Sequence, residues 1–357
     1  MLERLRCGKA QNPQPDLEFY AAAERGILAA KKIADKFAAA AEAKIVLAAD
    51  EAEKVNLRRI AAVAGKIPWY PAETFFEGLA CLRFLYEIGS VLDGVGMSVI
   101  GAPDSMPIEL YENDLALGRI TRGDARDLIC RFLVQTDCKL SPLLPIREQF
   151  NAGEQGDTLI LGGVDEAGRV TSNELSQLFL QAHETLKLIY PKIHCRISSG
   201  TPDNLLLEMA KPFIQGRNVI AFLNDDVLIP AQCAAGKSPR DAARYVAGGC
   251  WEVIVEGSEH SEGANNYFSM GKIMDCCIHP ADESMAKSGM KFELLDGAGS
   301  FDEAYKICLD NTRQALAQML KCISRNGRIW PLVNPAPFFS ACLDGCAESG
   351  VDYSNGG

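Results

Sequence analysis

The chain has 357 residues, of which 48% are hydrophobic, so it can bury a substantial core as one α/β barrel or as two smaller domains. Its formal net charge of −11 argues against general binding to nucleic acids or to anionic membranes. No apolar run approaches the roughly 18 residues that a membrane-spanning helix needs. Thirteen cysteines without a regular framework, after a start that lacks the apolar core of a signal peptide, favour a reducing cytoplasm over secretion.

The first third of the chain predicts helices. Residues 16–66 are rich in Ala, Glu, Lys and Leu, and their apolar residues recur at steps of three and four, which predicts two long helices. Pro71 begins a third helix that is expected to end near Leu92, and residues 121–124 start another. Between these two helices, residues 93–118 are rich in Gly, Pro and Asp and are predicted to form a loop. We therefore expect a helical scaffold that covers a barrel.

From residue 157 onward, predicted strands and helices alternate. The expected strands are short apolar runs bounded by glycine or polar residues, at 157–161, 193–197 and 219–223. Helices predicted at about 172–188 and 202–215 separate them. This alternation indicates an α/β barrel or a doubly wound sheet.

The remaining part of the chain has weaker patterns. Asn224 and Asp225 follow the third predicted strand, where polar side chains often face a site in such folds, but we interpret the pair as a helix cap. Residues 253–300 are glycine-rich and are predicted to be irregular. Residues 301–325 predict a helix whose apolar stripe packs in the core.

One cysteine stands in an unusual local context. Ser238 and Pro239 open a predicted helix, and the glycine pair before Cys250 ends it, which places Cys250 on a tight loop directly after that helix. A free cysteine is usually a small buried hydrophobe, so the thiol by itself does not indicate catalysis. Glu252 follows two residues later, and in an extended loop its side chain would point to the same side as Cys250.

The segment Gly249-Cys250-Trp251-Glu252 resembles the active-site loop of glycyl radical enzymes, the pyruvate formate-lyase superfamily, in their lyase and dehydratase branch. Other segments match in the order of that family over nearly the whole chain, at 58–61, 71–78, 98–104, 161–163, 173–175, 191–196, 224–225 and 346–357. Three positions depart from the family pattern. Ala102 replaces an arginine, Val253 a proline, and Trp251 a residue that is often small and aliphatic.

The resemblance implies part of a ten-stranded α/β barrel with a long helical N-terminal portion. It implies that residues 1–357 are a partial pyruvate formate-lyase-like domain of an enzyme of anaerobic metabolism. A thiyl radical at Cys250 would abstract hydrogen from a C–H bond of a small polar substrate, with Glu252 as general base and Tyr267 in the substrate pocket. A salt bridge to Arg244 is the alternative role for Glu252.

The resemblance also implies a glycyl radical, which relatives carry on an Arg-Val-x-Gly-aromatic loop. The only Arg-Val pair is Arg169–Val170, and Thr171 follows it without a glycine. We therefore expect the radical on a segment outside this chain, which alone should be inactive. No cofactor is expected to bind directly, and no metal, because the histidines are dispersed and Ser349 stands where a cluster motif would need a third cysteine after Cys346. The implied partners are a radical AdoMet activating enzyme and a second copy of the chain.

Several functions stay open. Gly249 replaces the second cysteine that acyl transfer from pyruvate uses, so the sequence favours cleavage of a C–X bond by a lyase or dehydratase. A radical decarboxylase, a formate acetyltransferase-like enzyme and an inactive truncated remnant are the alternatives within the family. An unrelated helical and α/β scaffold or thiol protein is the alternative outside it.

Overall fold

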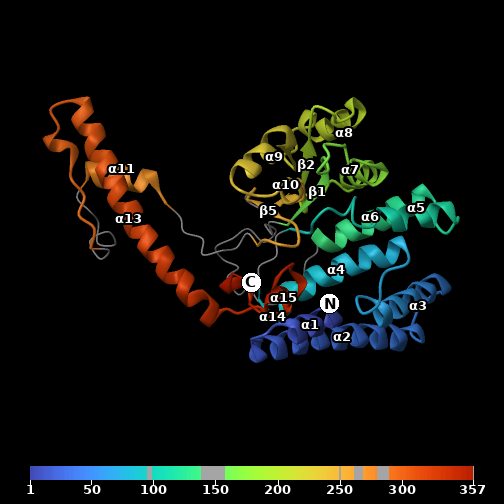
Figure 1. The fold of residues 1–357 in the computed structure, drawn as a ribbon. Helices are drawn as coiled ribbons and strands as arrows, with labels where there is room; N and C mark the ends of the chain where they lie inside the picture. The colour runs from blue at the N-terminus through green and yellow to red at the C-terminus, as the bar shows by residue number, and fades with distance from the viewer. Residues whose placement is uncertain (95–98, 138–156, 249–250, 261–267, 280–288, 357) are drawn as a thin grey trace. The chain divides into compact units, whose positions relative to one another are not determined.

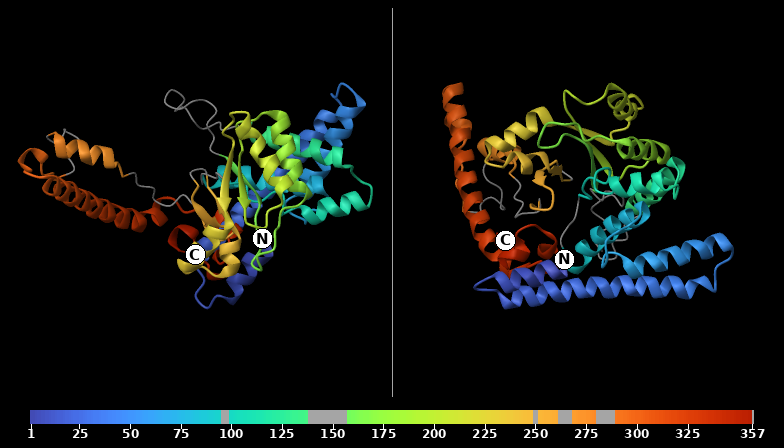
Figure 2. Two further views of the ribbon diagram at one scale, coloured as in Figure 1. Left: turned by 90° about the horizontal axis from the view of Figure 1, so that it is seen from above. Right: turned by 45° about the vertical axis from the view of Figure 1, so that its right-hand side comes forward.

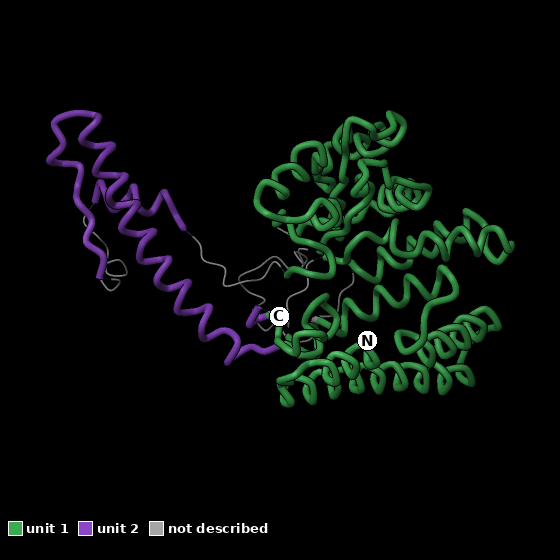
Figure 3. The backbone as a smooth tube through the Cα atoms, in the orientation of Figure 1, with its two compact units in different colours: residues 1–261, 336–353, 357 green, residues 262–335, 354–356 purple. Residues whose placement is uncertain are grey.

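The computed structural model describes residues 1–94, 99–137, 157–248, 251–260, 268–279 and 289–356 (Figures 1 and 2). The chain divides into two units (Figure 3). Unit 1 comprises residues 1–261, 336–353 and 357, and unit 2 comprises residues 262–335 and 354–356. No helix in the described ranges is long and apolar enough to cross a membrane.

Unit 1 begins with a series of helices. They are α1 (Leu2–Gln11), α2 (Leu17–Ile45), α3 (Glu51–Lys66), α4 (Phe75–Leu92), α5 (Ile108–Ala116) and α6 (Arg122–Asp137). Asp16, Asp50 and Thr74 cap α2, α3 and α4 by accepting hydrogen bonds from backbone N–H groups of the first turn. The two long helices predicted within 16–66 are therefore confirmed. The predicted loop at 93–118 is wrong in part, because it contains α5.

A parallel sheet follows, as the alternation of strands and helices predicts. Its strands are β1 (Thr158–Gly162), β2 (Lys192–Ile197) and β3 (Ile220–Asn224), hydrogen-bonded in the order β1-β2-β3. The helices α7 (Glu174–Leu186) and α8 (Asp203–Ile214) form the crossovers between them. Ile160, His194 and Ala221 lie at one level across the three strands, which fixes the faces of the sheet.

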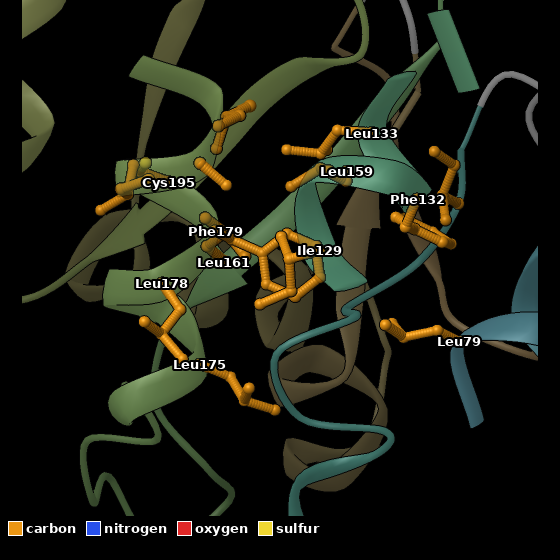
Figure 4. Close-up of a cluster of buried hydrophobic side chains, with 14 of the residues drawn as sticks. Leu79, Ile129, Phe132, Leu133, Leu159, Leu161, Leu175, Leu178, Phe179 and Cys195 are labelled. Atoms are coloured by element: carbon orange, nitrogen blue, oxygen red, sulfur yellow. The ribbon is translucent and has the colours of Figure 1, made fainter. Parts of the chain in front are cut away.

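The two faces of this sheet have different surroundings. Side chains of one face, including Leu159, Leu161 and Cys195, pack with apolar residues of α6 and α7 in the largest core cluster of unit 1 (Figure 4). The opposite face carries Thr158, Ile160, His194 and Arg196, and we call it the inner face. Ile160 packs there against residues of a short antiparallel hairpin. Polar groups on this buried inner face therefore lie between two sheets.

That hairpin consists of β4 (Tyr245–Ala247) and β5 (Val253–Val255). It follows α9 (Asp225–Ala234) and α10 (Pro239–Ala243), whose start is capped by Ser238. The predicted helix after Ser238 is therefore real but short. The prediction that the Cys250 loop follows it directly is wrong, because β4 intervenes. The irregular structure predicted from residue 253 is also wrong at β5.

The two ends of unit 1 pack together in a second core. The helices α14 (Pro337–Cys342) and α15 (Cys346–Ser349) contact α2 and α1. The turn η2 (Tyr353–Asn355) follows them in the chain, and its last two residues belong to unit 2. Phe338 is buried in this core, and the Tyr20 hydroxyl donates to the Ala347 carbonyl at 3.1 Å. Gly350 has φ +70°, and an added Cβ would lie 2.8 Å from the Tyr20 ring. A glycine is therefore required at this close approach.

Unit 2 contains α11 (Met270–Ile278), the turn η1 (Leu295–Gly297) and α13 (Phe301–Val333). Ile273 and Cys277 of α11 pack against Ala315 of α13. The predicted helix at 301–325 is confirmed and is longer than expected. Its apolar stripe is only partly in a core, because the side chain of Phe301 is 81% exposed. α11 lies in the region predicted to be irregular, so that prediction is wrong there too.

Candidate functional site

Between β4 and β5 the structure describes Gly248, Trp251 and Glu252. The Gly248 N–H donates to the Glu252 carbonyl at 2.8 Å, and the Trp251 N–H donates to the Gly248 carbonyl at 2.9 Å. Trp251 has φ +74°, a left-handed conformation that is uncommon for a large side chain. The extended backbone expected between Cys250 and Glu252 is therefore not found at Trp251. The expectation that Cys250 and Glu252 point to the same side assumed an extended backbone, and the conformation of Trp251 does not meet that assumption.

The predicted site residues lie in or after the segment between β4 and β5. Cys250 and Tyr267 are outside the described residues. Glu252 is described, and its side chain is exposed. The Arg244 guanidinium, the alternative partner for Glu252, donates to the Glu256 carbonyl at 3.1 Å and lies 3.8 Å from the Asp344 carboxylate. Of the three predicted site residues, the structure therefore places only Glu252, at the end of the hairpin turn.

The inner face of the sheet contacts the hairpin at the last residue of β4 and at Trp251. The Thr158 hydroxyl donates to the Ala247 carbonyl at 3.2 Å. The His194 and Trp251 rings meet edge to face, with centroids 6.3 Å apart and planes at 86°. The Trp251 side chain is nevertheless 60% exposed, while His194 is 0% exposed. The contact between the Trp251 ring and the buried His194 imidazole thus joins the turn to the sheet.

His194 is a buried imidazole on the inner face of the sheet. Neither ring nitrogen meets the geometry of a hydrogen bond with a described residue, although the Ala247 carbonyl, which accepts from Thr158, lies close enough to favour a protonated ring. Burial lowers the pKa of His194 from its ordinary value of 6.5 to about 4, against the weaker opposing effect of the Ala247 backbone. The ring is therefore neutral at physiological pH.

A buried ion-pair cluster lies at the start of the hairpin. The Arg196 guanidinium donates to the Asp225 carboxylate from Nε at 3.0 Å and from Nη2 at 2.9 Å. The Tyr245 hydroxyl donates to the same carboxylate at 2.5 Å, and burial, followed by the Asp225 charge, raises the pKa of Tyr245. Asn224 caps α9 through the Asp226 N–H, as predicted. The sequence interpretation missed that Asp225 belongs to this cluster.

The loop after residue 99 is tied to the hairpin and to the sheet. Glu256 Oε1 accepts a hydrogen bond from the Ala102 N–H at 3.2 Å, and burial raises the pKa of Glu256. Gly101 has φ +93°, and an added Cβ would lie 2.8 Å from Glu256 Oε1. Asp104 accepts from the Gly162 N–H at 2.8 Å and from the Ser176 hydroxyl at 2.6 Å, and burial raises its pKa. These two carboxylates were not predicted as site residues.

A metal site is not apparent in the part of the chain that the structure describes. No group of three His, Cys, Asp or Glu side chains there could hold a metal ion. The described groups that lie around the hairpin include instead the His194 imidazole, the buried Arg196–Asp225 ion pair and the half-buried Glu256 carboxylate. Such a setting can hold a short hairpin in one position.

Comparison with known proteins identifies the family. The family model described as pyruvate formate lyase-like matches residues 2–357. The chain belongs to this family. The predicted relationship to glycyl radical enzymes of the lyase and dehydratase branch is confirmed, since the chain is similar to trans-4-hydroxy-L-proline dehydratase of Clostridioides difficile and to isethionate sulfite-lyase of Nitratidesulfovibrio vulgaris.

The extent of these similarities differs. The dehydratase is 25% identical over 98% of this chain and 44% of its own length, and the sulfite-lyase is 28% identical over 64% of this chain and 28% of its own length. A solved structure concerned with 1,2-propanediol dehydration in Roseburia inulinivorans has a TM-score of 0.91 and 25% identity, over 100% of this chain and 46% of that chain. The chain therefore spans less than half the length of these relatives, and it shares their fold, as predicted.

Proposed function

We propose that the chain is the central catalytic part of a glycyl radical lyase or dehydratase that acts on a small hydroxyl-bearing substrate. The observation that carries this proposal is the position of the Gly-Cys-Trp-Glu motif. Trp251 and Glu252, the part of this motif that the structure describes, immediately precede β5 in a hairpin that packs on the buried inner face of a parallel sheet. The relatives that bear dehydratase and sulfite-lyase names support the same class of reaction.

In the proposed reaction, Cys250 supplies a thiyl radical that takes a hydrogen atom from a substrate C–H bond, so an S–H bond forms as the C–H bond breaks. Glu252 accepts the proton of the neighbouring hydroxyl group, and the adjacent C–X bond breaks with its electron pair leaving on X. The product radical then takes the hydrogen atom back from the Cys250 thiol. Exclusion of water from the site protects the radical species from quenching.

A glycyl radical supplies the acceptor that first removes hydrogen from the Cys250 thiol. No Arg-Val-x-Gly-aromatic sequence occurs in residues 1–357, so we place this glycine on residues outside them. We also propose that a radical AdoMet activating enzyme generates the radical, and that the active protein is a homodimer. Both proposals rest on the family relationship.

The test uses the complete reading frame, expressed without oxygen together with an activating enzyme, and a panel of diols, hydroxysulfonates and hydroxyproline. We expect Cys250→Ser to abolish product formation while the glycyl radical signal in electron paramagnetic resonance remains. The exposed Cys322→Ser variant should retain full turnover. Product formation by Cys250→Ser at the wild-type rate would refute the proposal.

A second variant tests the role of the carboxylate. Glu252→Gln should lower C–X cleavage by about 10²–10⁴-fold, the usual contribution of a general base, while substrate hydrogen still exchanges with the thiol. Glu208→Gln, which removes a surface ion pair with Lys211, is the matched control. Equal turnover in the Glu252→Gln and Glu208→Gln proteins would assign Glu252 a structural role instead.

A decarboxylase is the second candidate function. Indoleacetate decarboxylase of Tractidigestivibacter scatoligenes is 26% identical over 69% of this chain. Arylacetates added to the same substrate panel decide between the two, because a decarboxylase would release carbon dioxide from them and leave the diols unchanged.

A further inference from the structure

The buried cluster of Asp225, Arg196 and Tyr245 joins three separate elements of unit 1. Arg196 lies on the central strand β2, Asp225 is the first residue of α9, and Tyr245 is the first residue of β4. The Arg196 side chain is 7% exposed and the Asp225 side chain 0%. Tyr245 is also 0% exposed. The hairpin therefore begins at a point fixed by charged groups from two other elements.

Four hydrogen bonds converge on the single carboxylate of Asp225. Two come from Arg196 and one from the Tyr245 hydroxyl, and the fourth comes from the Val164 N–H at 2.8 Å. The Arg196 guanidinium also lies over the Tyr245 ring, 4.1 Å from its centroid, and reaches the Tyr245 carbonyl at 3.4 Å. Tyr245, the first residue of β4, is thus held by Asp225 and Arg196 through both its side chain and its backbone carbonyl.

The cluster is better suited to fixing a position than to adding stability. Taking two charges out of water is costly, and apolar residues of similar volume often replace a buried ion pair without loss of stability. Directional hydrogen bonds to a carboxylate, in contrast, are satisfied in only one arrangement of the groups. A pair of strands three residues long is marginally stable by itself, so the hairpin needs such external contacts.

We propose that Asp225, Arg196 and Tyr245 are positioning residues for the radical reaction, because they set the place of the β4–β5 hairpin that carries Cys250. This inference rests on the proposed function of Cys250. Hydrogen transfer requires close and well-aligned partners, and a misplacement of about 1 Å can lower a rate by about 10²-fold. The cluster acts through the hairpin, so its loss changes turnover more than substrate binding.

The first measurement is hydrogen exchange of the backbone, which requires no turnover. Tyr245→Phe keeps the ring over Arg196 and removes one hydrogen bond to a charged group. We expect the amides of residues 245–256 to exchange about 10- to 100-fold faster. Tyr20→Phe is the matched control, because Tyr20 is equally buried and its hydroxyl donates to a backbone carbonyl far from the hairpin in sequence.

The second measurement is turnover of the activated complete enzyme on its identified substrate. We expect Tyr245→Phe to lower kcat by about 10-fold or more with KM nearly unchanged, and Asp225→Glu to retain more turnover than Asp225→Ala. Unchanged exchange at 245–256 in Tyr245→Phe would overturn the inference. Faster exchange with unchanged kcat would also overturn it.

The two hypotheses fail in different ways. Wild-type turnover in Cys250→Ser refutes the proposed function, and the inference with it, while faster hairpin exchange in Tyr245→Phe would still show that the cluster holds the hairpin. Loss of turnover in Cys250→Ser combined with an unaffected Tyr245→Phe protein refutes only the positioning role.

Discussion

Protonation of His194 should destabilise unit 1 in mild acid. The ring is buried on the inner face, its nitrogens do not meet the geometry of a hydrogen bond with a described residue, and its pKa is lowered from 6.5 to about 4. In the unfolded chain, His194 binds a proton below about pH 6.5, whereas in the folded chain it stays neutral until about pH 4. The folded state therefore has its full stability above pH 6.5 and loses it as the pH falls from 6.5 toward 4.

The size of this effect follows from the two pKa values. A difference of one pKa unit corresponds to about 1.4 kcal/mol, so the full loss below pH 4 is about 3 kcal/mol. Between pH 7 and pH 5 the loss attributable to His194 is about 2 kcal/mol. After burial, the larger effect on the pKa of His194 is that of the Ala247 backbone, which favours protonation of the ring, and the smaller is that of Lys192, which opposes it. The raised pKa values of Asp104 and Glu256 act with the opposite sign.

Comparison with His194→Leu isolates the contribution of this ring, because every other titrating group is common to both proteins. Urea unfolding at pH 7 and pH 5 should show the wild-type protein losing about 2 kcal/mol more than the variant. The chain has four histidines, so ¹³C-labelled histidine also allows the pKa of His194 to be read directly by NMR. A His194 resonance that titrates near pH 6.5, or equal losses in the two proteins, would refute the reasoning.

Two further substitutions test individual contacts in unit 1. Gly350→Ala should lower the free energy of unfolding by about 1–3 kcal/mol more than Gly216→Ala does. Both glycines have positive φ, but only at Gly350 would a Cβ lie against Tyr20. Equal thermal midpoints of the two variants would contradict this expectation. Asp104→Ala should cost about 3 kcal/mol, because it leaves the buried Ser176 hydroxyl and a backbone N–H without their acceptor. The Ser258→Ala variant, at an exposed position of unit 1, should change stability by less than about 0.5 kcal/mol in the same urea titration.

The sequence predicted the elements that depend on local interactions. Helical periodicity and side-chain caps such as Asp16 and Asp50 act within one or two turns, so α2 and α3 could be recognised from their residues alone. The strands β1 and β2 were recognisable as short apolar runs between glycine and polar residues. In contrast, β4 has only three residues beside a glycine pair, and such a strand exists only because β5 pairs with it and the three-stranded sheet packs against it.

The composition of the candidate site was decided by tertiary structure. His194 and Arg196 alternate with apolar residues in β2, and this alternation indicates a polar inner face. It does not predict which residues His194 and Arg196 contact. Asp225 and Tyr245 lie 29 and 49 residues after Arg196, and they meet it because parallel pairing and the return of the hairpin bring three strand ends together. The preference of a segment for helix or strand depends on its neighbours in the sequence, whereas burial and hydrogen-bond partners depend on which elements pack together. The segment that carries the site could therefore be predicted from the sequence, but the residues that surround it could not.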